Sequence, residues 1–335
     1  MRYRSIGTTD LRASEVGFSV TTVTAIAGGP GSARGPRTDA DVVALLWRAL
    51  DLGVTFFDTA DADGVDGRGE RVLGRAVRGR RDEVTIATKF GWDVDPPGLA
   101  QAPRAPVHDW SVAYAGRALD RSLGRLALEP IDLWQLHHPG MDAIESEELF
   151  AFLAEQVAKG KIRHYGVALG PGTGWADEGV AALRDRRVAA VQTVFNLTEP
   201  EPGRELAQVA GETGAGLLAR LTPAPALAGG MPIPGPASQG AGHVRPDSGR
   251  PPAGPAGGGA GDARRLERFD FLTRDRDQTL GQAACRFVLG SPAVATVLPD
   301  IDDEERLVEY ATASDLPDLT AADADRIAEL HEARQ

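Results

Sequence analysis

Three short apolar runs of this sequence end in residues that could do acid–base chemistry. Asp58 follows the run 54–57, Lys89 follows 84–88, and His137 follows 131–136. Asp63 comes five residues after Asp58, in the polar stretch where the chain turns. Carboxylate, ammonium and imidazole groups can move protons to and from a substrate when they share one site. The pattern therefore predicts catalysis by Asp58, Asp63, Lys89 and His137, whereas the neighbouring His138 is interpreted as a structural or surface residue.

A fold that gathers these strand ends is indicated by the alternation of apolar runs with segments of helical periodicity. Eight strands separated by helices are typical of an α/β protein with a single (β/α)8 TIM barrel, whose active sites lie at the carboxyl ends of the strands. The alternative is an open doubly wound sheet, but the glycines of 27–31 lack the spacing expected there. The predicted strands are 16–20, 54–57, 84–88, 131–136, 162–167, 188–195, 216–221 and 295–298.

We expect one domain over residues 1–335, with an N-terminal β-hairpin that turns around Gly7-Thr8-Thr9-Asp10. The segment 223–262 interrupts the repeat after strand seven, and 20 of its 40 residues are Gly or Pro. Such a composition buries too little apolar surface to offset the entropy of ordering the chain. We therefore predict a mobile loop on the catalytic face, which is either an active-site lid or a passive surface linker.

Charge, apolar content and cysteine count limit the kinds of partner that the protein can have. The net charge is −12 and no basic cluster is present, which argues against nucleic acid as a partner. No apolar run reaches the roughly 18 residues that a membrane-spanning helix needs. The single cysteine, Cys285, excludes an internal disulfide, and we predict no metal site. These features favour a cytoplasmic protein that acts on a small molecule, and they leave the oligomeric state open.

Several longer motifs, taken in order, resemble those of the aldo-keto reductases. That resemblance implies a cytosolic (β/α)8 barrel that reduces carbonyl groups with NADPH, using an Asp, Tyr, Lys and His tetrad. Asp58, Lys89 and His137 match the family pattern, but Asp63 stands where the family places its catalytic tyrosine. The motifs lie at 57–60 (FDTA), 69–74 (GERVLG), 87–91 (ATKFG), 131–137 (IDLWQLH), 160–167 (GKIRHYGV) and 191–197 (VQTVFNL).

The cofactor site that the resemblance implies is altered at several places. Residues 166–169 read Gly-Val-Ala-Leu where the family has polar groups for the nicotinamide carboxamide. Pro223 and Pro225 remove backbone donors from the loop that wraps the diphosphate. Five acids within 300–305 stand where the family binds the 2′-phosphate, and they would repel it. Gln192 and Glu309 match cofactor contacts and are interpreted as vestigial, so we predict that no cofactor is used.

Three functions follow from these residues. The main hypothesis is a cofactor-independent acid–base reaction on a small oxygenated carbonyl substrate: dehydration, isomerisation, cyclisation or cleavage. In it Asp63 and His137 exchange protons, while Lys89 and Asp58 set their pKa values. The first alternative is an NADPH-dependent carbonyl reductase in which water or His137 supplies the proton, because an unperturbed aspartate is an anion at neutral pH. The second alternative is a catalytically silent binding protein.

Overall fold

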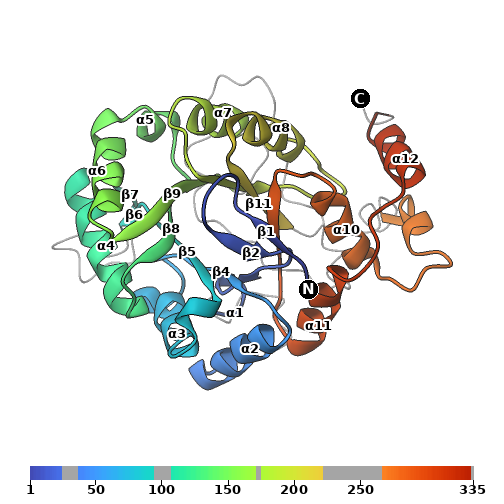
Figure 1. The fold of residues 1–335 in the computed structure, drawn as a ribbon, viewed down its shortest axis with the longest axis horizontal. Helices are drawn as coiled ribbons and strands as arrows, with labels where there is room; N and C mark the ends of the chain where they lie inside the picture. The colour runs from blue at the N-terminus through green and yellow to red at the C-terminus, as the bar shows by residue number, and fades with distance from the viewer. Residues whose placement is uncertain (25–36, 94–106, 171–174, 222–265, 333–335) are drawn as a thin grey trace.

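The computed structural model describes residues 1–24, 37–93, 107–170, 175–221 and 266–332. Eight parallel strands form one sheet, in the order β12-β11-β10-β9-β8-β5-β4-β3. Figure 1 shows the helices arranged as a ring around this sheet. The predicted (β/α)8 barrel is therefore confirmed. The strands are β3 (Phe18–Ser19), β4 (Phe56–Asp58), β5 (Thr85–Phe90), β8 (Ile131–His137), β9 (Ile162–Ala168), β10 (Ala190–Val194), β11 (Gly216–Leu221) and β12 (Val294–Pro299).

The barrel closes where the last strand meets the segment that leads into the first. Val16 forms a parallel bridge with Val297 of β12. Gly17 N donates to the Val297 carbonyl at 2.9 Å, and Val297 N donates to the Glu15 carbonyl at 2.8 Å. These bonds join the two edges of the sheet, so the strand ends point toward one shared mouth.

Between the strands, the helices pack their apolar faces on the outside of the barrel. α2 shows how the sequence starts such a helix: Thr38 and Asp41 form a reciprocal capping box, and Val42, Leu46 and Ala49 are buried. The described helices are α1 (Thr21–Thr24), α2 (Asp39–Asp51), α3 (Arg68–Ala76), α4 (Val112–Leu126), α5 (Met141–Ile144), α6 (Glu147–Ala158), α7 (Ala176–Arg184), α8 (Gly203–Thr213), α10 (Leu280–Leu289), α11 (Glu304–Ala313) and α12 (Ala321–Glu332), with short 3-10 turns η1 (Val65–Gly67), η2 (Arg81–Glu83) and η3 (Asp270–Leu272).

An antiparallel hairpin, β1 (Tyr3–Ser5) and β2 (Arg12–Ser14), closes the barrel at the amino-terminal ends of its strands. Ile6 and Leu11 of the hairpin pack into a cluster with Phe56 and Leu133, which belong to β4 and β8. The predicted N-terminal hairpin is thus confirmed. The hairpin covers the amino-terminal end of the barrel, so a ligand-binding site must lie at the carboxyl ends of the strands.

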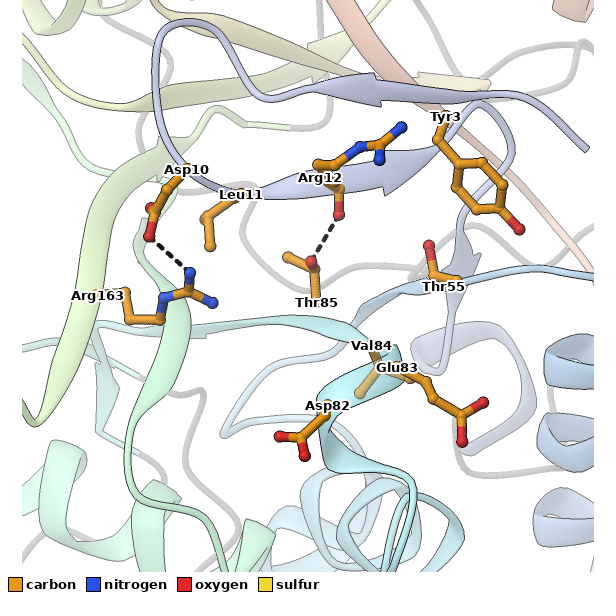
Figure 2. A pocket seen from close by; sticks show the side chains of 10 residues that line it. All are labelled: Tyr3, Asp10, Leu11, Arg12, Thr55, Asp82, Glu83, Val84, Thr85 and Arg163. Atoms are coloured by element: carbon orange, nitrogen blue, oxygen red, sulfur yellow. Dashed lines mark hydrogen bonds and ion pairs between the residues drawn. The ribbon is translucent and has the colours of Figure 1, made fainter.

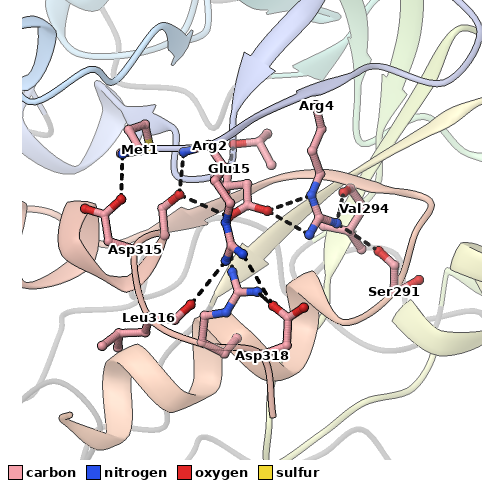
Figure 3. A network of polar contacts seen from close by, with 12 residues as sticks. Met1, Arg2, Arg4, Glu15, Ser291, Val294, Asp315, Leu316 and Asp318 are labelled. Atoms are coloured by element: carbon pink, nitrogen blue, oxygen red, sulfur yellow. Dashed lines mark hydrogen bonds and ion pairs between the residues drawn. The ribbon is translucent and has the colours of Figure 1, made fainter. Parts of the chain in front are cut away.

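A buried carboxylate ties this hairpin to the C-terminal helices, as Figure 3 shows. Glu15 accepts hydrogen bonds from Arg2 and Arg4 of the hairpin region at 3.0 and 2.9 Å. From the other end of the chain, Arg286 donates at 3.1 Å and the Ser314 hydroxyl at 3.0 Å. The network therefore links the first and last parts of the barrel.

The Gly- and Pro-rich segment predicted over 223–262 lies outside the described residues. Among the helices of the described ranges, none has the length and apolar character needed to cross a membrane.

Candidate active site

The side chains inside the barrel change from apolar to polar along each strand. In a β-strand, residues two apart face the same side. The lower, apolar members form the cluster on which the hairpin packs. The next inward positions are polar and lie toward the carboxyl ends: Phe56 is followed by Asp58, Ala87 by Lys89, Leu133 by Gln135 and then His137, Ala190 by Gln192, and Leu218 by Arg220.

Asp58 and Lys89 form a buried ion pair at the ends of β4 and β5. Lys89 Nζ lies 2.6 Å from Asp58 Oδ2 and also donates to the Thr59 carbonyl at 2.8 Å. The two side chains are 3% and 6% exposed, so water screens the pair weakly. The ammonium group is therefore held in one position at the mouth.

Asp63 lies in the turn after β4 and is buried. Its Oδ2 accepts hydrogen bonds from Thr21 Oγ1 at 2.6 Å and from Thr59 Oγ1 at 3.0 Å. Burial raises the pKa of Asp63, and this effect outweighs the lowering by Lys89 and the two hydroxyls. A carboxyl group with a raised pKa keeps its proton at higher pH than an exposed aspartic acid does.

His137 is the last residue of β8 and lies at the same mouth. Burial lowers its pKa far below the ordinary value, and His138, Lys89 and Arg220 lower it further. The imidazole is therefore neutral at physiological pH. A neutral imidazole can donate or accept a hydrogen bond, but it is not a source of acid protons.

His138 lies at the mouth as well, although the sequence was interpreted as giving it a structural or surface role. Its φ is 58°, in the left-handed region that few non-glycine residues adopt. The ring centroid lies 4.4 Å from that of His137 and 6.2 Å from that of Trp92. Burial and the cations Arg220 and Lys89 lower its pKa to about 3, so His138 is also neutral.

Several buried polar atoms of this layer have no hydrogen-bond partner among the described residues. They include both amide atoms of Gln135 and of Gln192. An unsatisfied buried polar group costs about 1–3 kcal/mol, so a ligand with complementary groups would gain free energy by pairing with these atoms. The remaining members are Asp58 Oδ1, His137 Nδ1 and Arg220 Nε. Gln135 and Arg220 were missed in the sequence, although strand parity with Lys89 and Gln192 could have identified them.

Glu309, the second predicted cofactor residue, stands apart from this layer. It belongs to α11, and its carboxylate accepts a hydrogen bond from the Thr279 hydroxyl at the start of α10. The contact fits a structural role between two outer helices. Of the six predicted site residues, the structure therefore places Asp58, Asp63, Lys89, His137 and Gln192 around the mouth.

The acids of 300–305 have partners that the sequence did not reveal. Asp303 caps α11, Asp302 pairs with Arg306 at 3.2 Å, and Glu304 pairs with Arg48 of α2 at 2.9 Å. Burial raises the pKa of Asp300 to about 6, so this group takes up a proton at higher pH than an exposed aspartic acid does. Arg306 and Arg48 thus offset part of the negative charge of this run.

A hollow at the opposite end of the barrel is separate from this site. Figure 2 shows it between the hairpin and the starts of β4 and β5, where Thr85 Oγ1 donates to the Arg12 carbonyl at 2.6 Å. Its volume is about 360 Å³, and Asp10 and Arg163 on its wall pair with each other at 2.7 Å. None of the predicted site residues lines it. In the described ranges, no group of three His, Cys, Asp or Glu side chains is placed to hold a metal ion.

A barrel with charged and imidazole groups at its strand ends is the architecture of many enzymes. The aldo/keto reductase family pattern matches residues 26–332, and the chain belongs to this family. The structure is similar to aldo-keto reductase AKR11C1 from Bacillus halodurans in its holo form, with a TM-score of 0.73 over 98% of this chain and 96% of that one. The identity is 24%, so this likeness supports the fold alone.

Curated relatives are similar to shorter stretches of the chain. An uncharacterized oxidoreductase of Bacillus subtilis, YqkF, is 34% identical over 50% of this chain and 49% of its own length. The 6-dehydroglucose reductase of Novosphingobium aromaticivorans is 37% identical over 39% and 42%, respectively. An NADP(+) aldo-keto reductase of Schizosaccharomyces pombe, yakc, is 37% identical over 40% and 38%. The chain thus spans half or less of the length of each.

These relatives correct two predictions made from the sequence. The main hypothesis of a cofactor-independent acid–base reaction is wrong, because the relatives are named as oxidoreductases and reductases. The prediction that no cofactor is used is wrong for the same reason, since one of those names carries NADP(+). Part of the error lies in the acidic run 300–305, where Arg48 and Arg306 pair with two of the five acids.

Proposed function

We propose that this chain is an NADP(H)-dependent oxidoreductase that reduces the carbonyl group of a small molecule. The observation that carries the proposal is the buried Asp58–Lys89 pair, which lies beside a neutral His137 and a buried Asp63 in a chain of the aldo/keto reductase family. The names of the two relatives, a 6-dehydroglucose reductase and an NADP(+) reductase, favour the same reaction type.

The polar layer offers suitable groups for the cofactor. Gln192 presents an amide oxygen and an amide nitrogen without partners, and these complement the carboxamide of a nicotinamide ring. The resemblance to the family assigns Gln192 to that contact. When bound, NADPH supplies the hydride that converts a carbonyl carbon to an alcohol carbon. Residues 222–265, which follow β11, lie outside the described residues.

Lys89 and His137 polarise and orient the carbonyl oxygen. Asp58 and the Thr59 carbonyl fix the Lys89 ammonium, so its positive charge is in place before negative charge develops on that oxygen. The neutral imidazole of His137 donates a hydrogen bond without bringing a second full charge into the mouth. Because His137 is neutral, the acid proton must come from another group.

Asp63 is the group that we assign as the general acid, in the place where the family has tyrosine. Its raised pKa increases the fraction of the carboxyl groups that carry a proton at a given pH, as a general acid requires. The proton moves to the carbonyl oxygen as the alcohol forms, and Asp63 is left as a carboxylate within the field of Lys89. Water restores the proton before the next turnover.

The experiment is a binding titration followed by a rate measurement. We expect NADPH to bind the purified protein, and we expect Gln192→Leu, which keeps the size of the side chain but removes both amide atoms, to weaken that binding by about 10-fold, as for one or two lost hydrogen bonds. Wild-type protein with NADPH should reduce a panel of short aldehydes, and Lys89→Met should not. Binding without turnover would indicate the catalytically silent protein, and absence of both would refute the proposal.

A further inference from the structure

Arg220 carries a charge at the mouth that the proposed reaction does not use. It lies near the end of β11, and its Nη2 donates to the Leu169 carbonyl at 2.8 Å and to the Gly170 carbonyl at 2.9 Å. Those carbonyls follow β9, while β10 lies between β9 and β11 in the sheet. The side chain therefore reaches across the end of β10.

This guanidinium has no carboxylate at ion-pair distance in the described part of the chain. Asp58 and Asp300 are near enough to act on it electrostatically, but Asp58 pairs with Lys89 and Asp300 accepts from Thr22. Its Nε atom is buried and lacks a hydrogen-bond partner among the described residues. The Arg220 side chain is half-buried, and its direct hydrogen-bond partners in the described part of the chain are carbonyl oxygens, so an anionic ligand would complete its shell with charge-assisted bonds.

The position of the charge points to the reacting end of the ligand. Arg220 acts electrostatically on both His137 and His138, so it lies near the groups that face the carbonyl. The planar fork of a guanidinium matches the two oxygens of a carboxylate or phosphate, and such charge-assisted bonds are stronger than neutral ones. An anion that binds here would lie close to the carbonyl carbon.

We propose that Arg220 binds a carboxylate or phosphate group of the substrate, so that the preferred substrates are oxo acids or phosphorylated aldehydes and ketones. The inference rests on the proposed carbonyl reduction and adds the class of substrate. The diphosphate of the cofactor offers the same chemistry, and the test separates the two sources.

The test compares substrates that differ only by a charged group. Initial rates with NADPH are measured for 4-oxobutanoate against butanal, and for glyceraldehyde 3-phosphate against glyceraldehyde. NADPH affinity is measured separately by fluorescence titration. The variants are Arg220→Met, Arg220→Lys, which keeps the charge but loses the fork, and the control Arg12→Gln, which removes an exposed cation from the hairpin end.

We expect wild-type protein to favour at least one charged substrate by about 10- to 100-fold in kcat/KM, the range for a charge-assisted hydrogen bond. Arg220→Met should remove that preference by raising KM for the charged substrate. Its kcat/KM for the uncharged substrate and its affinity for NADPH should stay nearly unchanged. Arg220→Lys should keep part of the preference. Arg12→Gln should behave as wild type. Circular dichroism melting of the Arg220 variants confirms that they fold.

Three results would overturn the assignment. One is an equal kcat/KM of the wild-type protein for charged and uncharged substrates. Another is a tenfold loss of NADPH affinity in Arg220→Met with equal losses on both substrates, which would move Arg220 to the cofactor. If no aldehyde is reduced at all, the proposed function fails on its own, and calorimetry with 4-hydroxybutanoate then tests the anion site. The third overturning result is that the wild-type protein does not bind 4-hydroxybutanoate, or that Arg220→Met binds it equally well.

Discussion

Replacing Asp63 by asparagine separates a general acid from a merely buried side chain. The change keeps the size of the residue, and the amide oxygen of asparagine can still accept hydrogen bonds from the Thr21 and Thr59 hydroxyls, which lie 2.6 and 3.0 Å from Asp63 Oδ2. The fold should therefore survive. An amide cannot give up an acid proton, so only the chemical step should suffer.

The size of the effect follows from the proposed role. General acid catalysis contributes about 10²–10⁴-fold, which corresponds to roughly 3–5 kcal/mol of transition-state stabilisation. Most of the loss should appear in kcat, because Asp63 is bound to the two threonines and is not assigned to cofactor binding. Since burial raises the pKa of Asp63, wild-type activity should fall as the pH rises through that pKa, and the variant should lose this limb of the profile.

The assay is NADPH oxidation with a saturating aldehyde, measured between about pH 5 and pH 9. Asp66→Asn is the matched control, because it makes the same chemical change at an exposed aspartate three residues along the chain. It should leave both rate and profile unchanged. If Asp63→Asn kept the wild-type kcat and the wild-type pH profile, the proton would have to come from water or another group, and the role assigned to Asp63 would be wrong.

Further predictions concern the charges that surround the site and close the barrel. Lys89→Met leaves Asp58 buried without its partner, so urea denaturation should show a loss of about 3–5 kcal/mol, and a loss below about 1 kcal/mol would contradict a buried pair. Glu15→Gln should lower the urea midpoint too. Burial alone would raise the pKa of Glu15, but Arg4 and Arg286 lower it on balance, so its stabilising effect is present above the ordinary pKa of 4.5 and is lost as the pH falls below that value. Its variant should therefore differ least from wild type in acid. His138→Gln should not alter the pH profile of activity above about pH 5, because His138 is already neutral there.

Strand positions could be predicted from the sequence because buried parallel strands appear as short apolar runs between helices. The predicted run 216–221 coincides with β11, and Asp58 and His137 end their strands as expected. Patterns of this kind can be recognised locally, because burial of a strand requires apolar residues within the strand itself. In the structure β4 and β5 are neighbours in the sheet, which brings Asp58 and Lys89 into contact.

Features that depend on distant residues could not be predicted in this way. The acids of 300–305 looked like a barrier to phosphate because their partner Arg48 comes from α2, far away in the sequence. His138 lies at the mouth with a left-handed backbone conformation, and its residue type alone does not predict that conformation. The raised pKa of Asp63 comes from burial, which a sequence shows only after the fold is known.

Transfer of deuterium is the most direct test of the central claim of carbonyl reduction. NADPH labelled at the transferable position is incubated with the protein and a reducible aldehyde, and the alcohol is examined by mass spectrometry. We expect deuterium to appear on the former carbonyl carbon in proportion to the NADPH consumed, and we expect Lys89→Met to abolish the transfer. An alcohol without deuterium, or a protein that leaves NADPH unconsumed across charged and uncharged aldehydes and ketones, would contradict it.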